Sequence, residues 1–482
     1  MSSTDVRRKA ARREPDAKRC SVGIVGGGLA GLSAACALAD AGYKVTLFER
    51  KSFLGGRASS YEHPGTGEVV DNCQHVLLGC CTNLLNLYQR LGVEDKVRWY
   101  KRITFIEPGG RSGFIEASSL PAPFHSVVSF LRYKLLSLRD KLGIARALMA
   151  LLAGVPKDSS DDFLSWLRRK GQTRAAIDRF WAPVLISSLN EDLDKSSVKY
   201  AAMVFRDAFL KSAEAGKMGV PTLPLSELYG VAADYIRVRG GEVLLRSGVD
   251  AVVCDDCGVT LRSNDREFNF DYAISAVPFH AVGRILPQSP VSEALQRKVN
   301  HLRTVPITGI HLWFDREFTA LEHAALLDRT IQWMFQKSKI LTRPAARSTD
   351  DDGSYLELVV SSSKNLLEMG RTEIVELAMK ELAEFFPAVR DAKLVKSTVI
   401  KEVHATFAPA PLSDEFRLSP PSPWPHLFFS GDWTATGWPS TMEGAVRAGY
   451  LTAEALSKAA GDAQRFTVPD LKPQGFMRLF RS

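Results

Sequence analysis

The feature that most constrains this chain is a glycine-rich turn between a short apolar strand and a helix of small residues. Residues 22–25 form the strand, and the glycines that follow in a G-x-G-x-x-G pattern are Gly26, Gly28 and Gly31. The first glycine of such a turn permits a tight bend, the second exposes backbone to a pyrophosphate, and the third lets helix and strand pack closely. We expect a helix over residues 29–41, whose free N–H groups and positive dipole end point at the phosphates. The pattern predicts a dinucleotide site.

A carboxylate and a second glycine turn follow this helix. Glu49 ends the next apolar strand, 18 residues after the last glycine of the first turn, where a carboxylate accepts hydrogen bonds from ribose hydroxyls. The sequence then continues through Gly55, Gly56 and Arg57. The two glycines allow a second close approach of the backbone to the dinucleotide, and the arginine can form a charge-assisted contact with phosphate oxygens. Because a nicotinamide site has no general need for this second turn, the segment predicts FAD as the cofactor.

Two segments near the end of the chain fit the same cofactor. Gly431 and Asp432 end an apolar strand, so the carboxylate suits ribityl hydroxyls or a phosphate-bound water, while an ordinary helix cap is the alternative for Asp432. A helix from about Met442 would point its N-terminus at flavin N1 and O2 and stabilise the negative charge of reduced flavin. The predicted cofactor-binding residues are Gly26, Gly28, Leu29, Ala30, Gly31, Glu49, Arg50, Gly55, Gly56, Arg57, Val249, Gly431, Asp432 and Met442.

Charge is distributed unevenly along the chain. The formal net charge is +8, and half of this excess lies in residues 1–20, which contain seven Lys or Arg against three acids. We expect residues 1–19 to be a disordered basic arm, a solubilising tail that does not bind nucleic acid, with contact to anionic lipid as the alternative. No apolar run approaches the ~20 residues of a spanning helix, and no secretory signal is expected.

The seven cysteines are scattered and odd in number. Cys254 and Cys257 have the spacing of half a zinc site, but neither a second pair nor a histidine cluster accompanies them. Two reduced thiols and no metal are therefore expected. A reducing, cytoplasmic location fits this pattern.

The order of strand and helix patterns predicts an α/β fold in which a Rossmann-type FAD-binding domain is written in three sequence pieces. Nucleotide-fold strands recur near residues 271–278 and 427–432, far from the first turn. We expect an α+β substrate-binding domain to be inserted between the pieces, an arrangement that resembles that of amine oxidases and phytoene desaturases. The predicted boundaries are 20–100, 221–285 and 401–465 for the FAD-binding domain, 101–220 and 286–400 for the substrate-binding domain, and 466–482 for a C-terminal tail.

The first insertion contains a basic amphipathic pattern. Between residues 127 and 142, apolar side chains recur at helical spacing with Arg and Lys between them. Such a stripe is usually core, but a basic amphipathic helix can also rest on a bilayer surface. Peripheral contact with the inner face of the plasma membrane is therefore a hypothesis. The tail residues 476–481 also combine apolar and basic side chains, so contact with lipid and folding back onto the protein are the two alternatives for this segment.

Two motifs resemble those of one enzyme family. The segments 56–61 and 71–80, together with 431–447, are similar to the hydroxysqualene dehydroxylases, or squalene-associated FAD-dependent desaturases, within the FAD-dependent amine oxidase and carotenoid desaturase superfamily. The resemblance covers most of residues 20–460. Cys73 stands where the family pattern has glycine, which leaves the backbone of that turn open.

The resemblance implies that reduced FAD removes the hydroxyl of hydroxysqualene to give squalene and water, as in hopanoid and squalene biosynthesis. It also implies an isoprenoid lipid substrate and partners of the squalene or hydroxysqualene synthase type. Three alternatives stay open: a carotenoid or phytoene-type desaturase, an amine oxidase, and a non-catalytic flavin- and lipid-binding scaffold.

The reaction needs a proton donor or its support beside the flavin, and an apolar tunnel. Asp71 and His75 are the candidate catalytic residues, because their strand leads toward the flavin in this fold; a turn cap and a structural histidine are the alternatives. Trp433 and Trp438 are candidates for the substrate pocket, with an ordinary place in the core as the alternative.

Overall fold

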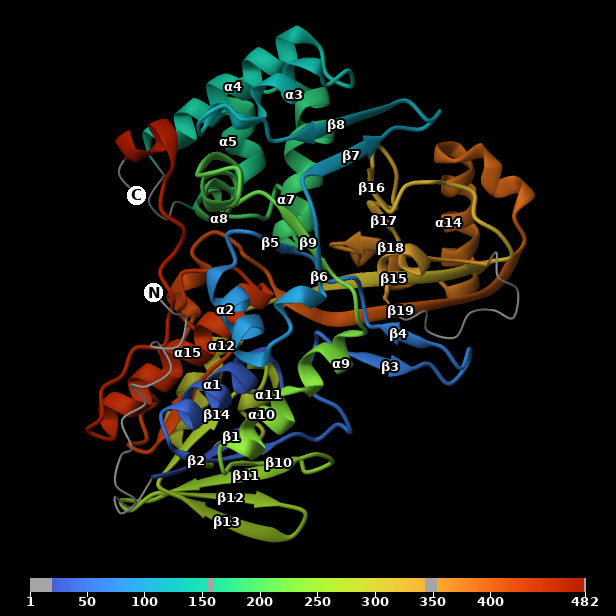
Figure 1. Ribbon diagram of the computed structural model, residues 1–482. Coiled ribbons are helices and arrows are strands. Elements are labelled where there is room, and N and C mark those ends of the chain that lie inside the picture. The colour runs from blue at the N-terminus through green and yellow to red at the C-terminus, as the bar shows by residue number, and fades with distance from the viewer. Residues whose placement is uncertain (1–19, 155–159, 343–352, 481–482) are drawn as a thin grey trace, which may run out of the picture.

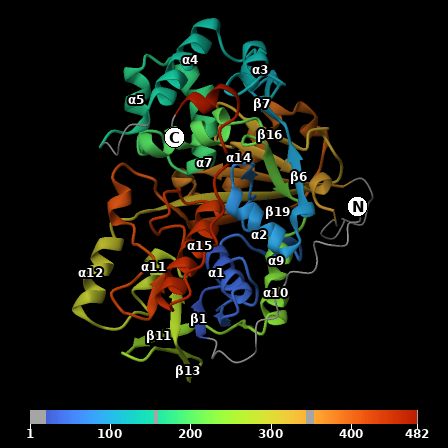
Figure 2. The same ribbon diagram turned by 60° about the vertical axis from the view of Figure 1, so that its left-hand side comes forward.

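The computed structural model describes residues 20–154, 160–342 and 353–480 (Figure 1). The predicted basic arm, residues 1–19, and the last two residues of the tail lie outside the described residues. In both views the helices around α4 occupy one end of the molecule and the strands β11 and β13 occupy the opposite end (Figures 1 and 2). The Rossmann-type sheet lies near the second of these ends.

The nucleotide-binding sheet contains five parallel strands in the order β10-β2-β1-β14-β20. These strands are β1 (Ser21–Val25), β2 (Lys44–Phe48), β10 (Glu242–Leu244), β14 (Tyr272–Ser275) and β20 (Leu427–Phe429). They come from all three predicted pieces of the FAD-binding part. Because four of the five strands are short and largely buried, while β10 at the edge is more exposed, apolar residues in those four occur in succession rather than in alternation.

Two helices pack closely beside this sheet. α1 (Leu29–Asp40) begins at the glycine turn, as predicted, and α15 (Met442–Ala459) crosses it. The approach is close enough that a Cβ on Gly449 would lie 2.0 Å from Ser33 Oγ and 2.3 Å from Ala30 O, so only glycine fits there. α2 (Thr82–Leu91), α9 (Leu225–Gly230) and α10 (Ala232–Val238) complete this layer.

A three-stranded antiparallel sheet packs against the first two strands. Its strands are β11 (Val249–Cys254), β12 (Val259–Ser263) and β13 (Arg266–Phe270). Phe48 makes edge contacts with Phe268 and Phe270, with ring centroids 5.0 and 6.0 Å apart. A Cβ on Gly23 would lie 2.6 Å from side-chain atoms of Leu261, which shows how close the layers are.

The second large sheet has seven strands in the order β19-β15-β18-β17-β16-β7-β8. They are β7 (Arg102–Ile106), β8 (Ser112–Glu116), β15 (Thr304–Phe314), β16 (His323–Leu326), β17 (Trp333–Gln336), β18 (Ser354–Ser361) and β19 (Leu394–Phe407). Both predicted insertions contribute to it, and α14 (Arg371–Phe385) packs against it. The boundary predicted at 400/401 falls inside β19, because this long strand continues its pairing with β15.

The amphipathic pattern of the first insertion does not form one helix. α3 (Val127–Arg132) ends before α4 (Leu138–Ala153), and Ser137 caps α4 in a capping box with Asp140. Tyr133 and Leu135 turn inward between the two helices and are buried. The other helices of this group are α5 (Phe163–Arg169), α6 (Arg174–Ala176), α7 (Ala182–Leu189) and α8 (Val198–Met203), with π-helical turns at Ile177–Trp181 and Val204–Leu210.

Short elements connect the two large units. β5 (Leu77–Leu78), β6 (Val97–Tyr100) and β9 (Met218–Pro221) form a small sheet, and β3 (Ser60–Glu62) pairs with β4 (Val69–Asp71). The remaining helices are α11 (Phe279–Val282), α12 (Pro290–Val299) and α13 (Lys337–Ile340). Met477 of the tail packs into a small core with Ala122 and Leu210. None of the helices in the described ranges is long and apolar enough to cross a bilayer.

Candidate flavin and substrate site

One large cavity lies between the nucleotide-binding sheet and the seven-stranded sheet. Its volume is about 1170 Å³, and both units supply its walls. Single-ligand pockets usually measure ~300–1,000 Å³, so this cavity has room for a large dinucleotide and part of a second ligand. Of the fourteen predicted cofactor residues, all but Gly31 line it.

The glycines form an open cradle at one end of the cavity. Gly28 and Gly55 are joined in a parallel bridge, and a Cβ on Gly56 would lie 2.8 Å from Gly28 Cα. A Cβ on Gly28 would meet nothing closer than 3.8 Å, so its exposed face is free for a pyrophosphate. A Cβ on Gly31 would lie 1.9 Å from Gly26 O, which makes this glycine a packing residue, as the sequence pattern predicts.

Glu49 stands at the end of β2 with both carboxylate oxygens held by backbone. Oε2 accepts a hydrogen bond from Gly27 N at 2.8 Å, and Oε1 accepts one from Lys51 N at 2.7 Å. The side chain is buried and lines the cavity. Each oxygen keeps a lone pair, so the carboxylate can also accept hydrogen bonds from ribose hydroxyls.

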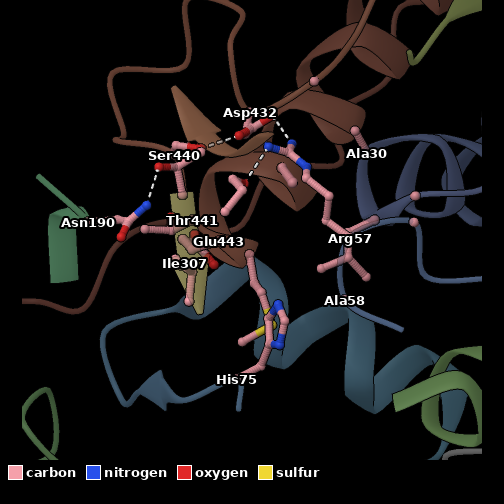
Figure 3. Close-up of a pocket in the computed structure, with 18 of the residues that line it drawn as sticks. Ala30, Arg57, Ala58, His75, Asn190, Ile307, Asp432, Ser440, Thr441 and Glu443 are labelled. Atoms are coloured by element: carbon pink, nitrogen blue, oxygen red, sulfur yellow. Dashed lines mark hydrogen bonds and ion pairs between the residues drawn. The ribbon is translucent and has the colours of Figure 1, made fainter. Parts of the chain in front are cut away.

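Arg57 joins the second glycine turn to the distant Gly431–Asp432 segment (Figure 3). Its Nη2 is 2.5 Å from Asp432 Oδ1, and its Nη1 donates to Ala405 O at 2.8 Å. Burial by itself would raise the pKa of Asp432, but the charge and hydrogen bonds of Arg57 and the hydroxyl of Ser440 outweigh it and lower the pKa. The sequence predicts a pairing of Arg57 with phosphate oxygens; in the structure its guanidinium holds a carboxylate at the cavity wall.

The N-terminus of α15 also faces the cavity. Thr441 caps the helix by accepting a hydrogen bond from Gly444 N at 3.0 Å, and Met442 lines the wall. The neighbouring Glu443 carboxylate accepts hydrogen bonds from Leu84 N at 2.8 Å and Asn83 Nδ2 at 2.9 Å, so it fixes α15 against the start of α2. These contacts fix the N-terminus of α15 at the cavity wall, and its contact with the flavin stays a prediction.

His75 lines the cavity beyond the cradle, and its ring extends toward the other labelled wall residues (Figure 3). Its Nδ1 lies 2.8 Å from Cys73 O. A carbonyl oxygen only accepts, so Nδ1 has to carry the proton and Nε2 is left as an acceptor. Burial is the largest influence on the ring and lowers the pKa of His75. The imidazole is thus a neutral base at neutral pH.

Asp71 lies behind the cavity wall and does not line it. Its carboxylate accepts hydrogen bonds from Ser60 Oγ at 2.5 Å and Lys337 Nζ at 2.7 Å. Burial raises the pKa of Asp71, but the charge of Lys337 and the hydrogen bonds lower it by more. The pKa is therefore below its usual value, and Asp71 is ionised. An ionised carboxylate outside the cavity cannot protonate a ligand, and this position fits the alternative role of supporting the turn.

The two predicted pocket tryptophans differ in their surroundings. Trp433 is 1% exposed and donates from Nε1 to Val277 O at 3.0 Å, so most of its ring belongs to the core and one edge reaches the cavity. Trp438 is half-buried at the wall, with the guanidinium of Arg447 5.0 Å from its ring centroid.

Sequence reasoning missed the apolar half of the cavity wall. These side chains come from both insertions and include Ile103, Phe105, Val184, Met203, Val204, Phe209, Met218, Ile307, Trp333, Phe335 and Val359. Trp333 and Phe335 stack with ring centroids 5.8 Å apart. The alternating positions of Trp333 and Phe335 indicate a strand in the sequence. That this face of β17 lines a cavity depends on how distant strands pair, which the sequence does not show.

A histidine pair was also missed. His280 and His404 stack at 4.5 Å on the cavity wall, near Arg57. Burial, with the charges of His404 and Arg57, lowers the pKa of His280 to about 4. His280 lies in α11 and His404 in β19, two elements that the sequence alone does not bring together.

Comparison with known proteins agrees with this geometry. Residues 29–457 match the Flavin containing amine oxidoreductase family. The chain belongs to this family. FAD is its cofactor, and the open glycine cradle, the oriented Glu49 carboxylate and the helix end at Met442 fit the parts of that molecule.

Relatives of this flavoprotein include two named desaturases. It is 27% identical over 474 residues to the 15-cis-phytoene desaturase of Synechococcus elongatus, and the alignment covers 92% of this chain and 97% of the relative. It is 28% identical over 474 residues to the zeta-carotene desaturase of Synechocystis sp., with 90% and 96% covered. An oxidoreductase structure from Methanosarcina mazei shares the fold with a TM-score of 0.68 at 18% identity, covering 89% of this chain and 98% of that one.

Proposed function

We propose that this flavoprotein desaturates a linear isoprenoid hydrocarbon chain. The observation that supports this most directly is the change of wall chemistry along one cavity, from the glycine cradle through His75 to apolar and aromatic side chains. A long hydrocarbon has no polar groups to bind, so a tunnel of apolar side chains is what holds it. The two desaturase relatives, aligned over nearly their whole length, support the same substrate class.

Desaturation removes two hydrogens from adjacent carbons, one as hydride and one as a proton. FAD bound in the glycine cradle would supply the acceptor for the hydride and would be reduced by it. His75 is the proposed acceptor of the proton, because its Nε2 is unprotonated while Nδ1 is fixed by Cys73 O. The electron pair of the C–H bond that loses its proton forms the carbon–carbon double bond, while the pair of the other C–H bond leaves with the hydride.

Reductive dehydroxylation of hydroxysqualene is the second candidate. The similarity of segments 71–80 and 431–447 to hydroxysqualene dehydroxylases supports it. In that direction bound reduced FAD would supply the hydride. The C–O bond breaks, and the hydroxyl leaves as water after it receives a proton. A protonated His75 would be the donor, and a synthase that makes hydroxysqualene would be the expected partner.

One experiment separates the two. The purified protein loaded with FAD is incubated with phytoene, zeta-carotene or squalene and an artificial electron acceptor, and separately, after anaerobic reduction, with hydroxysqualene. New conjugated double bonds in the first arm support desaturation, and squalene in the second arm supports dehydroxylation. Peroxide released from amines would favour amine oxidation, and no turnover in any arm would leave only flavin and lipid binding.

We also propose that the protein rests on an anionic membrane surface. The helical end exposes an apolar face, defined as Leu120, Phe124, Val127, Val128, Leu131, Leu138, Leu142, Met149, Phe476, Leu479 and Phe480. Phe124 contacts Phe476, with ring centroids 5.9 Å apart, so the tail continues the face formed by α3 and α4. Such a surface is the counterpart of a lipid substrate that is stored in a bilayer.

The charges around this face fit anionic lipid. Exposed cations accompany it at Arg132, Lys134, Arg139, Arg146 and Arg478. Asp140 is the one acid in residues 118–154, and it is buried in the cap of α4. A cationic rim around exposed apolar side chains is typical of an interfacial binding surface and supports the proposal that the protein contacts an anionic leaflet, such as the cytoplasmic one.

A further inference from the structure

A buried lysine from the seven-stranded sheet reaches into the turn that contains His75. Lys337 begins α13, directly after β17, and its side chain is 2% exposed. Its Nζ donates to Asp71 Oδ2 at 2.7 Å and to Gln74 Oε1 at 2.9 Å, and lies 3.4 Å from Glu357 Oε2. Burial lowers the pKa of Lys337, but the two carboxylates raise it above its usual value, so the ammonium stays charged.

Gln74 extends this contact to the histidine. Its Oε1 is held by Lys337, and its Nε2 donates to His75 O at 2.9 Å. His75 in turn donates from Nδ1 to Cys73 O. Both ends of the Gln74 amide are therefore committed, and one ammonium group is tied to the His75 carbonyl through Gln74 and to the Asp71 carboxylate directly.

The same segment forms part of the substrate wall. Trp333 and Phe335 of β17 line the cavity, and Lys337 follows two residues later at the start of α13. The short stretch 333–337 therefore contains both part of the apolar wall and the lysine that holds the turn of His75. This stretch fixes the distance between the wall and His75. Lys337 itself does not line the cavity, so it would act through the turn and not on a ligand.

We propose that Lys337 is a positioning residue for His75: by holding Asp71 and Gln74 it sets the direction in which Nε2 faces the cavity. The charge of Lys337 also keeps Asp71 ionised, so that Asp71 stabilises the turn without a proton of its own. The inference rests on the proposed function only in taking His75 as the proton acceptor.

The test needs variants that do not leave a buried charge unpaired. Lys337→Met alone would strand Asp71, so the main variant is D71N/K337M, which removes this pair of charges, while the raised pKa of Glu357 lets that buried carboxyl take up a proton. D71N/K337Q keeps an amide donor at the same place and yields the same readouts if the first variant does not fold. The matched control is K339M, because Lys339 lies in the same helix but forms a partly exposed ion pair with Glu317 at 2.9 Å.

The first readout does not depend on turnover. Histidine labelled with ¹³C is observed by NMR in the FAD-loaded protein, and the His75 signal is assigned by its loss in H75Q. We expect D71N/K337M to shift the His75 resonance and its titration midpoint, and K337R and K339M to keep both. An unchanged His75 signal in a folded, FAD-loaded D71N/K337M protein would overturn the inference.

The second readout is the split between kcat and KM on the substrate found by the assay above. Misplacing a reacting group by about 1 Å costs on the order of 100-fold, so kcat of D71N/K337M should fall at least ~10-fold while KM stays within about twofold. K337R should restore most of kcat. A wild-type protein that turns over no isoprenoid contradicts the proposed function, whereas the NMR result still decides whether Lys337 positions His75.

Discussion

Arg57 and Asp432 lie 375 residues apart in the chain, and their side chains form an ion pair with Nη2 and Oδ1 2.5 Å apart. The pair ties the second glycine turn to the loop after β20, so two pieces of the FAD site are held in register. Asp432 is fully buried while Arg57 is 32% exposed. Water can therefore solvate the guanidinium if the ion pair is lost, whereas the buried carboxylate would be left as an unpaired charge.

Removing this ion pair should weaken FAD binding. In R57M the buried Asp432 carboxylate loses its cation and the loop after β20 is released, so we expect FAD affinity to fall at least ~10-fold, about 1.4 kcal/mol. Titration of the apoprotein with FAD, followed by quenching of flavin fluorescence, measures the change. The control is R262M, because Arg262 pairs with Glu267 on the surface at 2.9 Å, far from the cradle, and should leave FAD affinity unchanged.

The pH dependence of activity should reveal whether His75 acts as base or acid. Burial lowers the pKa of His75, so the neutral ring persists to lower pH than for an exposed histidine. As a base it should support full kcat at neutral pH and lose activity as the pH falls through its lowered pKa. As an acid for dehydroxylation it should instead gain activity over the same range.

H75Q supplies the matching variant. Loss of a general base usually costs ~10²–10⁴-fold, so kcat should fall by that factor and the acid limb of the pH profile should disappear. FAD affinity should stay close to that of the wild type, because His75 lies beyond the glycine cradle. An H75Q protein with the kcat and pH profile of the wild type would contradict the role of His75.

The cofactor half of the site could be predicted because each of its parts has a local chemical requirement. A turn that approaches a pyrophosphate needs glycine at Gly28, and a ribose site needs an acid at the end of the second strand, at Glu49. These requirements can be read within about 35 residues of sequence. The fold class follows from the same pattern and is confirmed by the family match.

The substrate half could not be predicted, because distant pairing decides it. Lys337 and Asp71 are 266 residues apart, and no local pattern indicates that a lysine after a strand will be buried beside a carboxylate. The helical spacing around residues 127–142 also misleads, since Tyr133 and Leu135 pack inward and break the helix while Leu138 stays exposed. In both cases tertiary packing overrides local preference.

Glu357 should make the stability of the protein depend on pH. Burial is the largest influence and, with Asp71 nearby, raises the pKa of Glu357 to about 7, although Lys337 lowers it. Because the pKa of Glu357 is higher in the folded protein than in the unfolded one, the group stabilises the fold at low pH. This contribution to the free energy of unfolding is fully present below the unfolded-state pKa of about 4.3 and is lost as the pH rises to about 7. The loss can reach ~3 kcal/mol at pH 8.

E357Q should therefore stabilise the protein at alkaline pH. The amide carries no charge, and Lys337 keeps Asp71 as its partner, so denaturant unfolding should show a gain of up to ~3 kcal/mol at pH 8 and little change at pH 5. E381Q is the contrast, because Glu381 accepts hydrogen bonds from the backbone N–H groups of Thr330 and Ile331 at 3.1 and 2.9 Å. Its replacement should destabilise the protein at both pH values.

Membrane docking through the apolar face should depend on side chains that contribute nothing to the core. Leu138 and Leu142 are 68% and 58% exposed, so L138S/L142S should fold normally. Burying a leucine in lipid is worth ~1.5–3 kcal/mol, so the double variant should bind vesicles containing phosphatidylglycerol at least ~10-fold more weakly in a flotation assay. The control V395S/V403S changes side chains of β19 that are 49% and 45% exposed in the seven-stranded sheet, outside the helical end, and should bind as the wild type does. Binding should also fall with salt, because the cations around the face act through charges screened over ~10 Å at 0.1 M. Equal binding to vesicles of phosphatidylcholine alone would show that apolar contact suffices, and unchanged binding of L138S/L142S would show that this face is not the docking surface.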